Sequence, residues 1–187
     1  MELASPALST QHSFLERIIG AMLLRSDIYD EIKRDPNATF QAAIVVLLGS
    51  IAGIFQQSMD NPIWVAFIPL NLIFWPLMAA KDVICAKYFL ARRTTWEMAD
   101  WYLRTSGFVF APNLLMFVIP AEGPVSLLRL LVFFWNGAAG VIALRQGLQL
   151  GPTGRALWVW FGSAFIAGAA TAIWLFVAVV TLAIIVA

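Results

Sequence analysis

Hydrophobic residues in this chain gather in long runs, and short segments between the runs hold most of the charged residues. A helix of about 18 or more apolar residues can cross the hydrocarbon core of a bilayer, which is about 30 Å thick. The pattern predicts four such helices, at about residues 40–57, 62–81, 105–120 and 125–145. A fifth apolar run covers residues 156–187 and has no turn signal strong enough to divide it.

The length of the last run determines how often it crosses. Thirty-two helical residues extend about 48 Å, which is more than one crossing requires. Two crossings need about 40 residues and a turn, so they do not fit. We therefore expect one long, tilted helix in residues 156–187 and five transmembrane helices in all.

The segment "HSFLERIIGAMLLRSDIYDEIKRDP" is different, because charged residues interrupt it every few positions. Ser13 and Glu16 have the spacing of a helix-capping box, and apolar residues follow at helical spacing. This predicts an amphipathic helix that lies on the membrane or, alternatively, a soluble helix docked onto the same protein. Asp35-Pro36 then has the form of a helix start. The chain is thus divided into a cytoplasmic segment, residues 1–35, and a five-span domain, residues 36–187.

Composition agrees with a membrane protein. The chain is 61% hydrophobic and 12% charged, too few charges to cover the apolar surface of a soluble fold. The fold class expected is therefore all-α and polytopic. A net charge of +1 gives no support to nucleic-acid binding, which requires a concentrated basic face.

The position of the basic residues predicts the orientation. Lys and Arg occur before the first span, between the second and third spans, and between the fourth and fifth. The loops around Asp60 and Glu122 have none. Because short cytoplasmic loops are enriched in Lys and Arg, we expect a cytoplasmic N-terminus and an external C-terminus. No secretory signal is recognisable in residues 1–17, so the first span would direct insertion, and the membrane would be the plasma or inner membrane if the chain is bacterial.

The stretch "WPLMAAKDVICAKYFLARR" places Lys81 and Asp82 next to each other at the end of the second run. The pair could form a buried active site. Long basic side chains can instead extend to the headgroups where a helix leaves the bilayer. We interpret Lys81 and Asp82 as this boundary.

Residues for catalysis are scarce. A nucleophilic serine requires a base within hydrogen-bond reach, and the single histidine, His12, lies outside every predicted span. Ser50 and Ser163 lie within spans, but no basic residue is predicted at their depth. The single cysteine, Cys85, excludes an internal disulfide. No set of metal ligands and no phosphate-binding loop is recognisable, so we expect no metal, no cofactor and no enzymatic activity.

Amides and glycines supply the polar and small positions inside the spans. Asn71, Asn113 and Asn136 fall near the middle of the second, third and fourth spans. They could form a polar path or, the interpretation we favour, hydrogen bonds between packed helices. Gly49 and Gly53 have the GxxxG spacing that allows close approach of two helices, within one chain or between two copies in a homo-oligomer.

A second amphipathic segment, "RRTTWEMADWYLRTSG", follows the second span. Thr94 and Glu97 form another capping box, while Trp96 and Trp101 are aromatic residues of the kind enriched at membrane interfaces. Together with Arg93, these tryptophans could anchor the segment among membrane lipids. They could equally be a docking surface for a cytoplasmic protein partner.

Several segments together resemble the Yip family of multi-pass membrane proteins, in its bacterial form. They are "FLERIIGAMLLRSDIYDEIKRDPNATFQAAIVVLL", "DWYLRTSGFVFAPNLL" and "ALRQGLQLGPTGRALWVW", with a proline-containing second span. The resemblance implies a five-span, non-enzymatic protein with a cytoplasmic N-terminus, related to factors that bind Rab GTPases. This chain lacks the long N-terminal region of the eukaryotic members, so no Rab-binding residue is transferred.

Two functions follow from the sequence. The leading expectation is a non-catalytic, Yip-like membrane protein that binds or organises lipids and protein partners. The alternative is a small solute transporter that uses the amides and the helices bent by Pro69 and Pro76.

Overall fold

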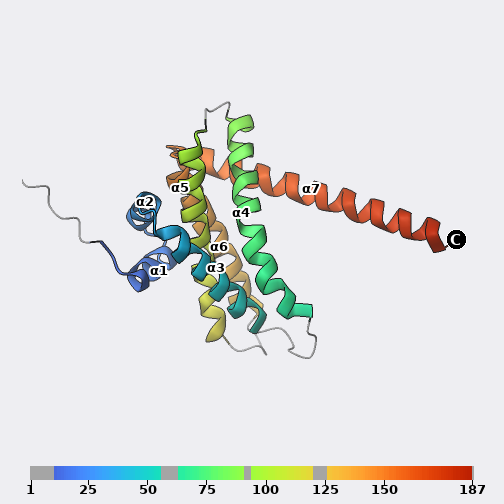
Figure 1. Ribbon diagram of the computed structural model, residues 1–187, viewed down its shortest axis with the longest axis horizontal. Coiled ribbons are helices and arrows are strands. Elements are labelled where there is room, and N and C mark those ends of the chain that lie inside the picture. Colours follow the sequence, from blue (N-terminus) through green and yellow to red (C-terminus); the bar gives the residue numbers. More distant parts are fainter. Residues whose placement is uncertain (1–10, 56–62, 91–93, 120–125, 187) are drawn as a thin grey trace, which may run out of the picture.

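The computed structural model describes residues 11–55, 63–90, 94–119 and 126–186, and every regular element in them is helical. The prediction of an all-α fold is therefore confirmed for these residues. The helices are α1 (Phe14–Met22), α2 (Ser26–Arg34), α3 (Ala38–Phe55), α4 (Ile63–Phe89), α5 (Trp96–Gly107), the 3-10 helix η1 (Phe108–Phe117), α6 (Ser126–Gly147) and α7 (Thr153–Val186) (Figure 1).

The N-terminal segment forms two short helices, where the sequence pattern predicts one. The capping box of α1 is present, since Glu16 N donates to Ser13 Oγ and Ser13 N donates to the Glu16 carboxylate. The chain turns after α1 at Leu24, which has a φ of 58°. Arg25 N donates to Gly20 O and Leu24 N donates to Ala21 O, the pattern of a Schellman motif. This motif ends α1 within the segment that the periodicity treats as continuous.

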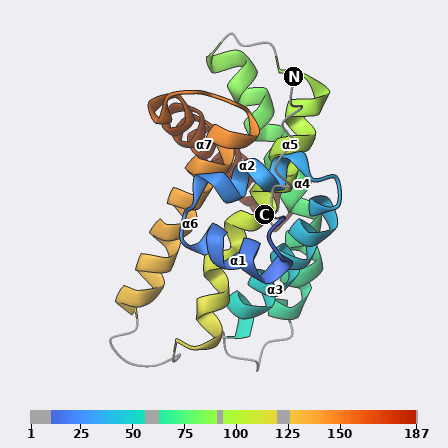
Figure 2. The same ribbon diagram turned by 90° about the vertical axis from the view of Figure 1, so that its left-hand side faces the viewer.

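Four helical rods pack into a bundle and alternate in direction. They are α3, α4, the continuous segment of α5 and η1, and α6. The C-terminal ends of α3 and η1 lie at the same end of the bundle as the starts of α4 and α6 (Figure 2). The starts of α5 and α7 lie at the opposite end, with the C-terminal ends of α4 and α6. The bundle therefore has the alternating course expected of a helical membrane domain.

The predicted third span begins inside α5 and continues directly into η1. Pro112 lies within η1; it has no N–H, and its ring excludes the usual position of the carbonyl group four residues earlier. The segment winds as a 3-10 helix, so the span has two parts. The amphipathic segment around Trp96 is consequently the first half of a bundle rod, and it is not a separate helix on the surface.

Among the described residues, three helices are long and apolar enough to cross a membrane. They contain Val65–Phe89 in α4, Leu127–Gly147 in α6 and Thr153–Ile173 in α7. The apolar part of α3, Ala38–Ile54, is shorter. This supports a membrane protein, in agreement with the composition.

Apolar side chains on the outside of the bundle point to the same conclusion. Several large ones are more than half exposed: Ile73, Leu77, Phe133, Phe134, Phe161 and Phe165. They come from the three helices that are long enough to span. Exposure of such apolar surfaces to water costs free energy, whereas contact with lipid chains does not.

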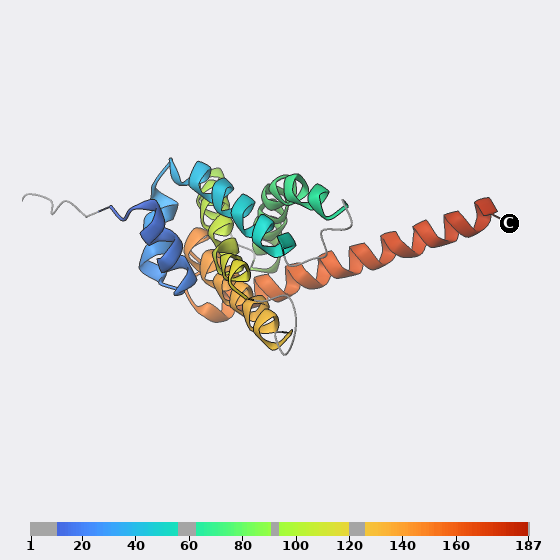
Figure 3. The same ribbon diagram turned by 90° about the horizontal axis from the view of Figure 1, so that it is seen from below.

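The last apolar run is one uninterrupted helix, as its length predicts. The first part of α7 packs on α4 and α6. The helix then leaves the bundle at a steep angle, so its far end lies well away from the other helices (Figures 1 and 3). Its contact with α4 is close, because a Cβ atom on Gly162 would lie 2.4 Å from the Phe89 ring.

Candidate functional site

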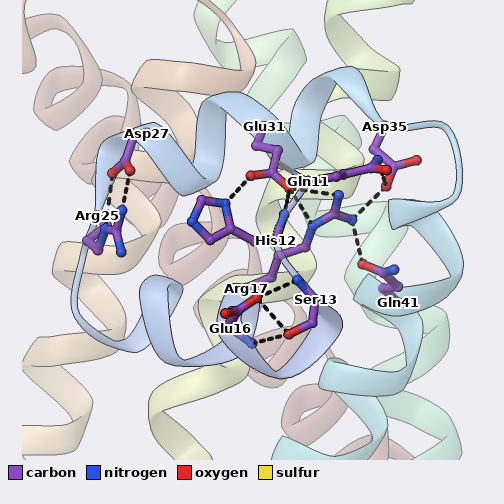
Figure 4. Close-up of polar contacts among 10 residues, drawn as sticks. All are labelled: Gln11, His12, Ser13, Glu16, Arg17, Arg25, Asp27, Glu31, Asp35 and Gln41. Atoms are coloured by element: carbon purple, nitrogen blue, oxygen red, sulfur yellow. Dashed lines mark hydrogen bonds and ion pairs between the residues drawn. The ribbon is translucent and has the colours of Figure 1, made fainter. Parts of the chain in front are cut away.

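A buried arginine forms the centre of a polar cluster at the start of the chain. Arg17 on α1 is only 1% exposed. Its Nη1 atom donates to Asp35 Oδ2 at 2.6 Å and to Gln41 Oε1 at 2.8 Å, and its Nε atom donates to Glu31 Oε1 at 3.0 Å (Figure 4). The cluster thus joins α1 to α2, to the turn before α3 and to α3 itself.

Further contacts hold the two carboxylates of this cluster in place. The His12 ring atom Nδ1 lies 2.5 Å from Glu31 Oε2, and the backbone N of His12 donates to Glu31 Oε1. Asp35 also accepts from Asn37 N at 2.9 Å. Helix α3 begins at Ala38, two residues later than Asp35-Pro36 predicts, and Asp35 caps the end of α2.

Hydrogen bonds and charge determine the pKa values of both carboxyl groups. Burial acts to raise the pKa of Glu31, but hydrogen bonds from His12 and Arg17 outweigh it and lower the pKa below 4.5. Burial likewise acts to raise the pKa of Asp35. Hydrogen bonds from the Arg17 guanidinium and from Asn37 N–H outweigh it and lower the pKa below 3.8. Both groups are therefore ionised near neutral pH.

Three contacts attach the α1–α2 layer to the bundle. Trp135 Nε1 donates to Met22 O at 2.6 Å, and Arg104 Nη1 donates to Lys33 O at 2.9 Å. Lys33 Nζ donates in turn to Gln146 O at 3.4 Å. Each acceptor is in the last turn of a helix, where carbonyl groups have no partner within the helix. The layer is therefore an integral part of the fold.

A second polar cluster surrounds Lys81 and Asp82. Helix α4 continues beyond the pair to Phe89, so the predicted end of the second helix near residue 81 is wrong, while the place of the pair at the bilayer boundary stays a prediction. Asp82 is 8% exposed, and its Oδ2 accepts from the Tyr102 hydroxyl at 2.7 Å. Lys81 Nζ lies 3.0 Å from Asp82 Oδ1 and 3.4 Å from Ser163 Oγ. The cluster connects α4, α5 and α7.

The contact with Ser163 corrects another expectation, that no basic residue lies at the depth of this serine. A lysine activates a serine only as a neutral amine that can take the hydroxyl proton. Here Lys81 is paired with the Asp82 carboxylate, and the Ser163 hydroxyl already donates to Trp160 O at 3.1 Å. The arrangement is that of a structural ion pair between helices, not of an activated nucleophile.

A cavity of about 410 Å³ lies beside Asp82, between α4, α5, η1, α6 and α7. Six aromatic residues line it: Phe67, Phe74, Trp75, Tyr102, Phe110 and Trp160. Asn71, Asp82 and Ser106 supply its polar side chains. An aromatic cavity of this size with a few polar groups has the character of a small-molecule site.

Two of the three predicted midplane amides meet. Asn136 Nδ2 on α6 donates to Asn113 Oδ1 on η1 at 2.5 Å. Asn71 lines the cavity, on α4. The first two amides fit the interpretation as a contact between helices, while Asn71 belongs to the polar part of the cavity wall.

The two glycines of the GxxxG pattern have different environments. A Cβ atom on Gly49 would lie 2.7 Å from Phe110 O, so α3 and η1 approach closely at this residue. A Cβ atom on Gly53 would meet nothing within 4 Å in the described part of the chain. Gly49 therefore serves packing within the chain.

The predicted docking residues do not share one surface. Trp96 is 93% exposed at the start of α5, whereas Trp101 is half-buried, with Lys33 Nζ 5.9 Å from its ring centroid. Arg93 lies outside the described residues. A groove of about 440 Å³ beside Trp96 is lined by Val83, Ile84, Lys87, Thr95 and Ala99, among others.

Neither Arg17 nor the Asp82–Tyr102 contact is among the predicted site residues. For Asp82 the sequence holds a signal, since the apolar pattern continues after it through Val83, Ile84 and Cys85. A carboxylate inside a continuing apolar helix requires a partner. Nothing local identifies the partner as Tyr102, which comes from the next helix.

Comparison of the chain with known protein families, with curated proteins and with solved structures finds no match. Within the described residues, no group of three or more His, Cys, Asp or Glu side chains is placed to hold a metal ion.

Proposed function

We propose that the chain is a non-catalytic integral membrane protein of the Yip type, which binds or organises partners at the membrane surface. The observation that carries this proposal is the exposed Trp96 beside the groove between α4 and α5. The buried Arg17 supports it, because its guanidinium is engaged with Glu31 and Asp35 of the same chain rather than presented to a substrate.

Five crossings with a cytoplasmic N-terminus belong to the same proposal. Helix α3 has 18 residues and extends about 27 Å, close to the thickness of a bilayer core. The rod of α5 and η1 extends about 38 Å at the rises of the two helix types. Both rods lie in the bundle with α4 and α6, which supports counting them as crossings.

The chemistry of the groove indicates an occupant that is apolar and acidic. Val83 and Ile84 give it an apolar wall, and Lys87 gives it positive charge. Trp96 at its rim can supply a large contact area with little loss of side-chain entropy. We propose that a soluble protein inserts a segment with these properties, in the mode of a peptide laid into a helix groove.

Photo-crosslinking in intact cells tests this proposal. A photoreactive residue replaces Trp96 in one variant and Trp158 in a control; Trp158 is 75% exposed on α7. A reproducible protein adduct is expected from position 96 and not from position 158. The Trp96→Ala variant is expected to lose the partner, and Trp158→Ala to retain it. Lipid adducts alone at both positions would reduce Trp96 to a membrane anchor and contradict the proposal.

Transport of a small solute is the second candidate, and the cavity beside Asp82 is the observation that favours it. Asn71→Leu is expected to abolish solute flux in proteoliposomes while the protein still assembles. Asn113→Leu is a less direct test, since it also breaks the contact with Asn136. Unchanged flux in the Asn71→Leu protein would exclude this function.

A further inference from the structure

The cavity beside Asp82 combines aromatic walls with a buried carboxylate. We infer that it binds a small apolar organic cation, such as an aromatic alkylammonium ion. The inference uses the same cavity as the second candidate function, but it requires binding only. It is independent of the Trp96 groove.

The cavity is large enough to hold a small organic cation. Its volume of about 410 Å³ lies in the range of ligand sites, about 300–1,000 Å³, and corresponds to a molecule with one ring and a short substituent. The side chains of Phe67, Phe74 and Met78 line it and are 42%, 46% and 47% exposed on α4. The entrance is therefore on the apolar surface of a spanning helix, which favours a ligand that partitions into the bilayer.

Three hydrogen-bond donors of the wall are already used. Tyr102 donates its hydroxyl proton to Asp82, and Trp75 Nε1 donates to Ser106 Oγ at 2.9 Å. The Ser106 hydroxyl donates in turn to Leu103 O at 2.9 Å. These three groups are therefore not available to an anion or to a ligand rich in acceptor groups, which leaves the Asn71 amide and the Trp160 indole N–H as donors of the wall.

An acceptor remains available. Asp82 Oδ1 is buried and receives no hydrogen bond from any group in the described part of the chain. Lys81 Nζ is 3.0 Å from it and supplies counter-charge, but Lys81 approaches from the side of Ser163 and is not part of the cavity wall. Asp82 therefore belongs to the cavity wall and pairs with an ammonium group that does not.

The charge of Asp82 and the aromatic rings of the cavity wall favour a ligand that is both cationic and aromatic. A cation is attracted to a carboxylate and to aromatic rings, whose π electrons give their faces partial negative charge. An anion would be repelled by Asp82, and a neutral hydrocarbon would give Oδ1 no partner beyond the Lys81 ammonium group. A cation with an aromatic group satisfies both the carboxylate and the walls.

Binding of benzyltrimethylammonium by the full chain in detergent or nanodiscs tests the inference. Trp75 and Trp160 line the cavity, so tryptophan fluorescence is expected to report the binding, with calorimetry as an independent measurement. The control ligand is neopentylbenzene, which has the same shape with carbon in place of the charged nitrogen. The cation is expected to bind saturably and at least tenfold more tightly than its neutral analogue.

Variants locate the site. Asp82→Asn is expected to weaken binding of the cation at least tenfold and to leave neopentylbenzene unaffected. Asp27→Asn is the matched control, since Asp27 is an exposed carboxylate on α2. A Lys81→Gln/Asp82→Asn double variant preserves net charge at the pair and is expected to lose the preference for the cation as well.

Equal affinity for the two ligands in the unaltered protein would overturn the inference, and so would the absence of saturable binding. Neither outcome depends on whether a variant folds. Cation binding that persists in Trp96→Ala would separate this site from the partner groove. Binding without flux in proteoliposomes would support the inference and count against transport.

Discussion

At the residue scale, the most informative group is Arg17, because a buried charge determines what its surroundings must contain. The guanidinium is satisfied by Glu31, Asp35 and Gln41, which come from three successive elements. Removing one partner from a buried ion pair leaves the other partner charged and unsolvated. The N-terminal layer therefore depends on this side chain.

We expect Arg17→Met to destabilise the protein by about 3 kcal/mol, since Glu31 and Asp35 would lose their main counter-charge. Thermal unfolding in detergent measures the effect. Arg25→Met is the control: Arg25 pairs with Asp27 at an exposed position, where water and salt screen the charges and the pair contributes little to stability. Equal loss in the two variants would show that the buried cluster contributes nothing beyond a surface pair.

The stability of the same layer is expected to depend on pH. The pKa values of Glu31 and Asp35 are lower in the folded protein than their ordinary values of 4.5 and 3.8. The unfolded chain therefore binds protons more readily, so the stabilisation is complete above those ordinary values and is lost as pH falls below them. Between pH 6 and pH 3.5, the melting temperature should fall more in the unaltered protein than in Glu31→Gln. A parallel fall in both would assign the acid sensitivity to other groups.

At the element scale, close packing of α3 on η1 is the contact that the GxxxG pattern anticipates. The sequence cannot say which partner a glycine faces, because a hydropathy pattern does not fix the rotation of a helix. The structure places Gly49 against the backbone of Phe110 and leaves Gly53 open. The two positions form a natural pair for comparison.

We expect Gly49→Ala to destabilise the bundle by about 1–3 kcal/mol, because the new Cβ atom would lie 2.7 Å from Phe110 O and the backbones would have to separate. Gly53→Ala is expected to be neutral or to stabilise α3 by up to about 1 kcal/mol, since alanine is the better helix former. Unfolding of both variants in one detergent provides the measurement. If Gly53→Ala alone were harmful, Gly53 would be the packing position, and this assignment would be reversed.

At the scale of the whole molecule, the direction of the bundle in the membrane determines which of its ends a soluble partner could reach. The described basic residues Lys87, Arg145 and Arg155 are near the end of the bundle where α5 and α7 begin. Positive charge is retained on the cytoplasmic side of membranes. Trp96 would therefore face the cytoplasm, where a soluble partner is available.

Labelling with a membrane-impermeant maleimide tests this orientation. The single native cysteine is removed by Cys85→Ser, and Glu97→Cys or Val118→Cys is then introduced; both positions are exposed, at opposite ends of the α5–η1 rod. We expect Val118→Cys to react in intact cells and Glu97→Cys to react only after the membrane is permeabilised. The reverse result would invert the orientation and place the Trp96 groove outside the cell.

The sequence by itself determines the class of this protein. Apolar runs in a chain that is 61% hydrophobic require helices and a membrane, and local signals identify the capping box at Ser13 and the undivided final helix. These features depend on neighbouring residues, so they are readable from periodicity and spacing. Contacts between side chains far apart in the sequence cannot be read from periodicity and spacing.

Only the tertiary structure decides which helices meet, and with them the sites. It joins Asp82 to Tyr102, brings Lys81 to Ser163, pairs Asn136 with Asn113 and assigns Asn71 to a cavity. It also merges the segment around Trp96 with the third predicted span. The physical reason is that helix rotation and the positions of neighbouring helices are fixed by packing of the whole bundle, which no local pattern encodes.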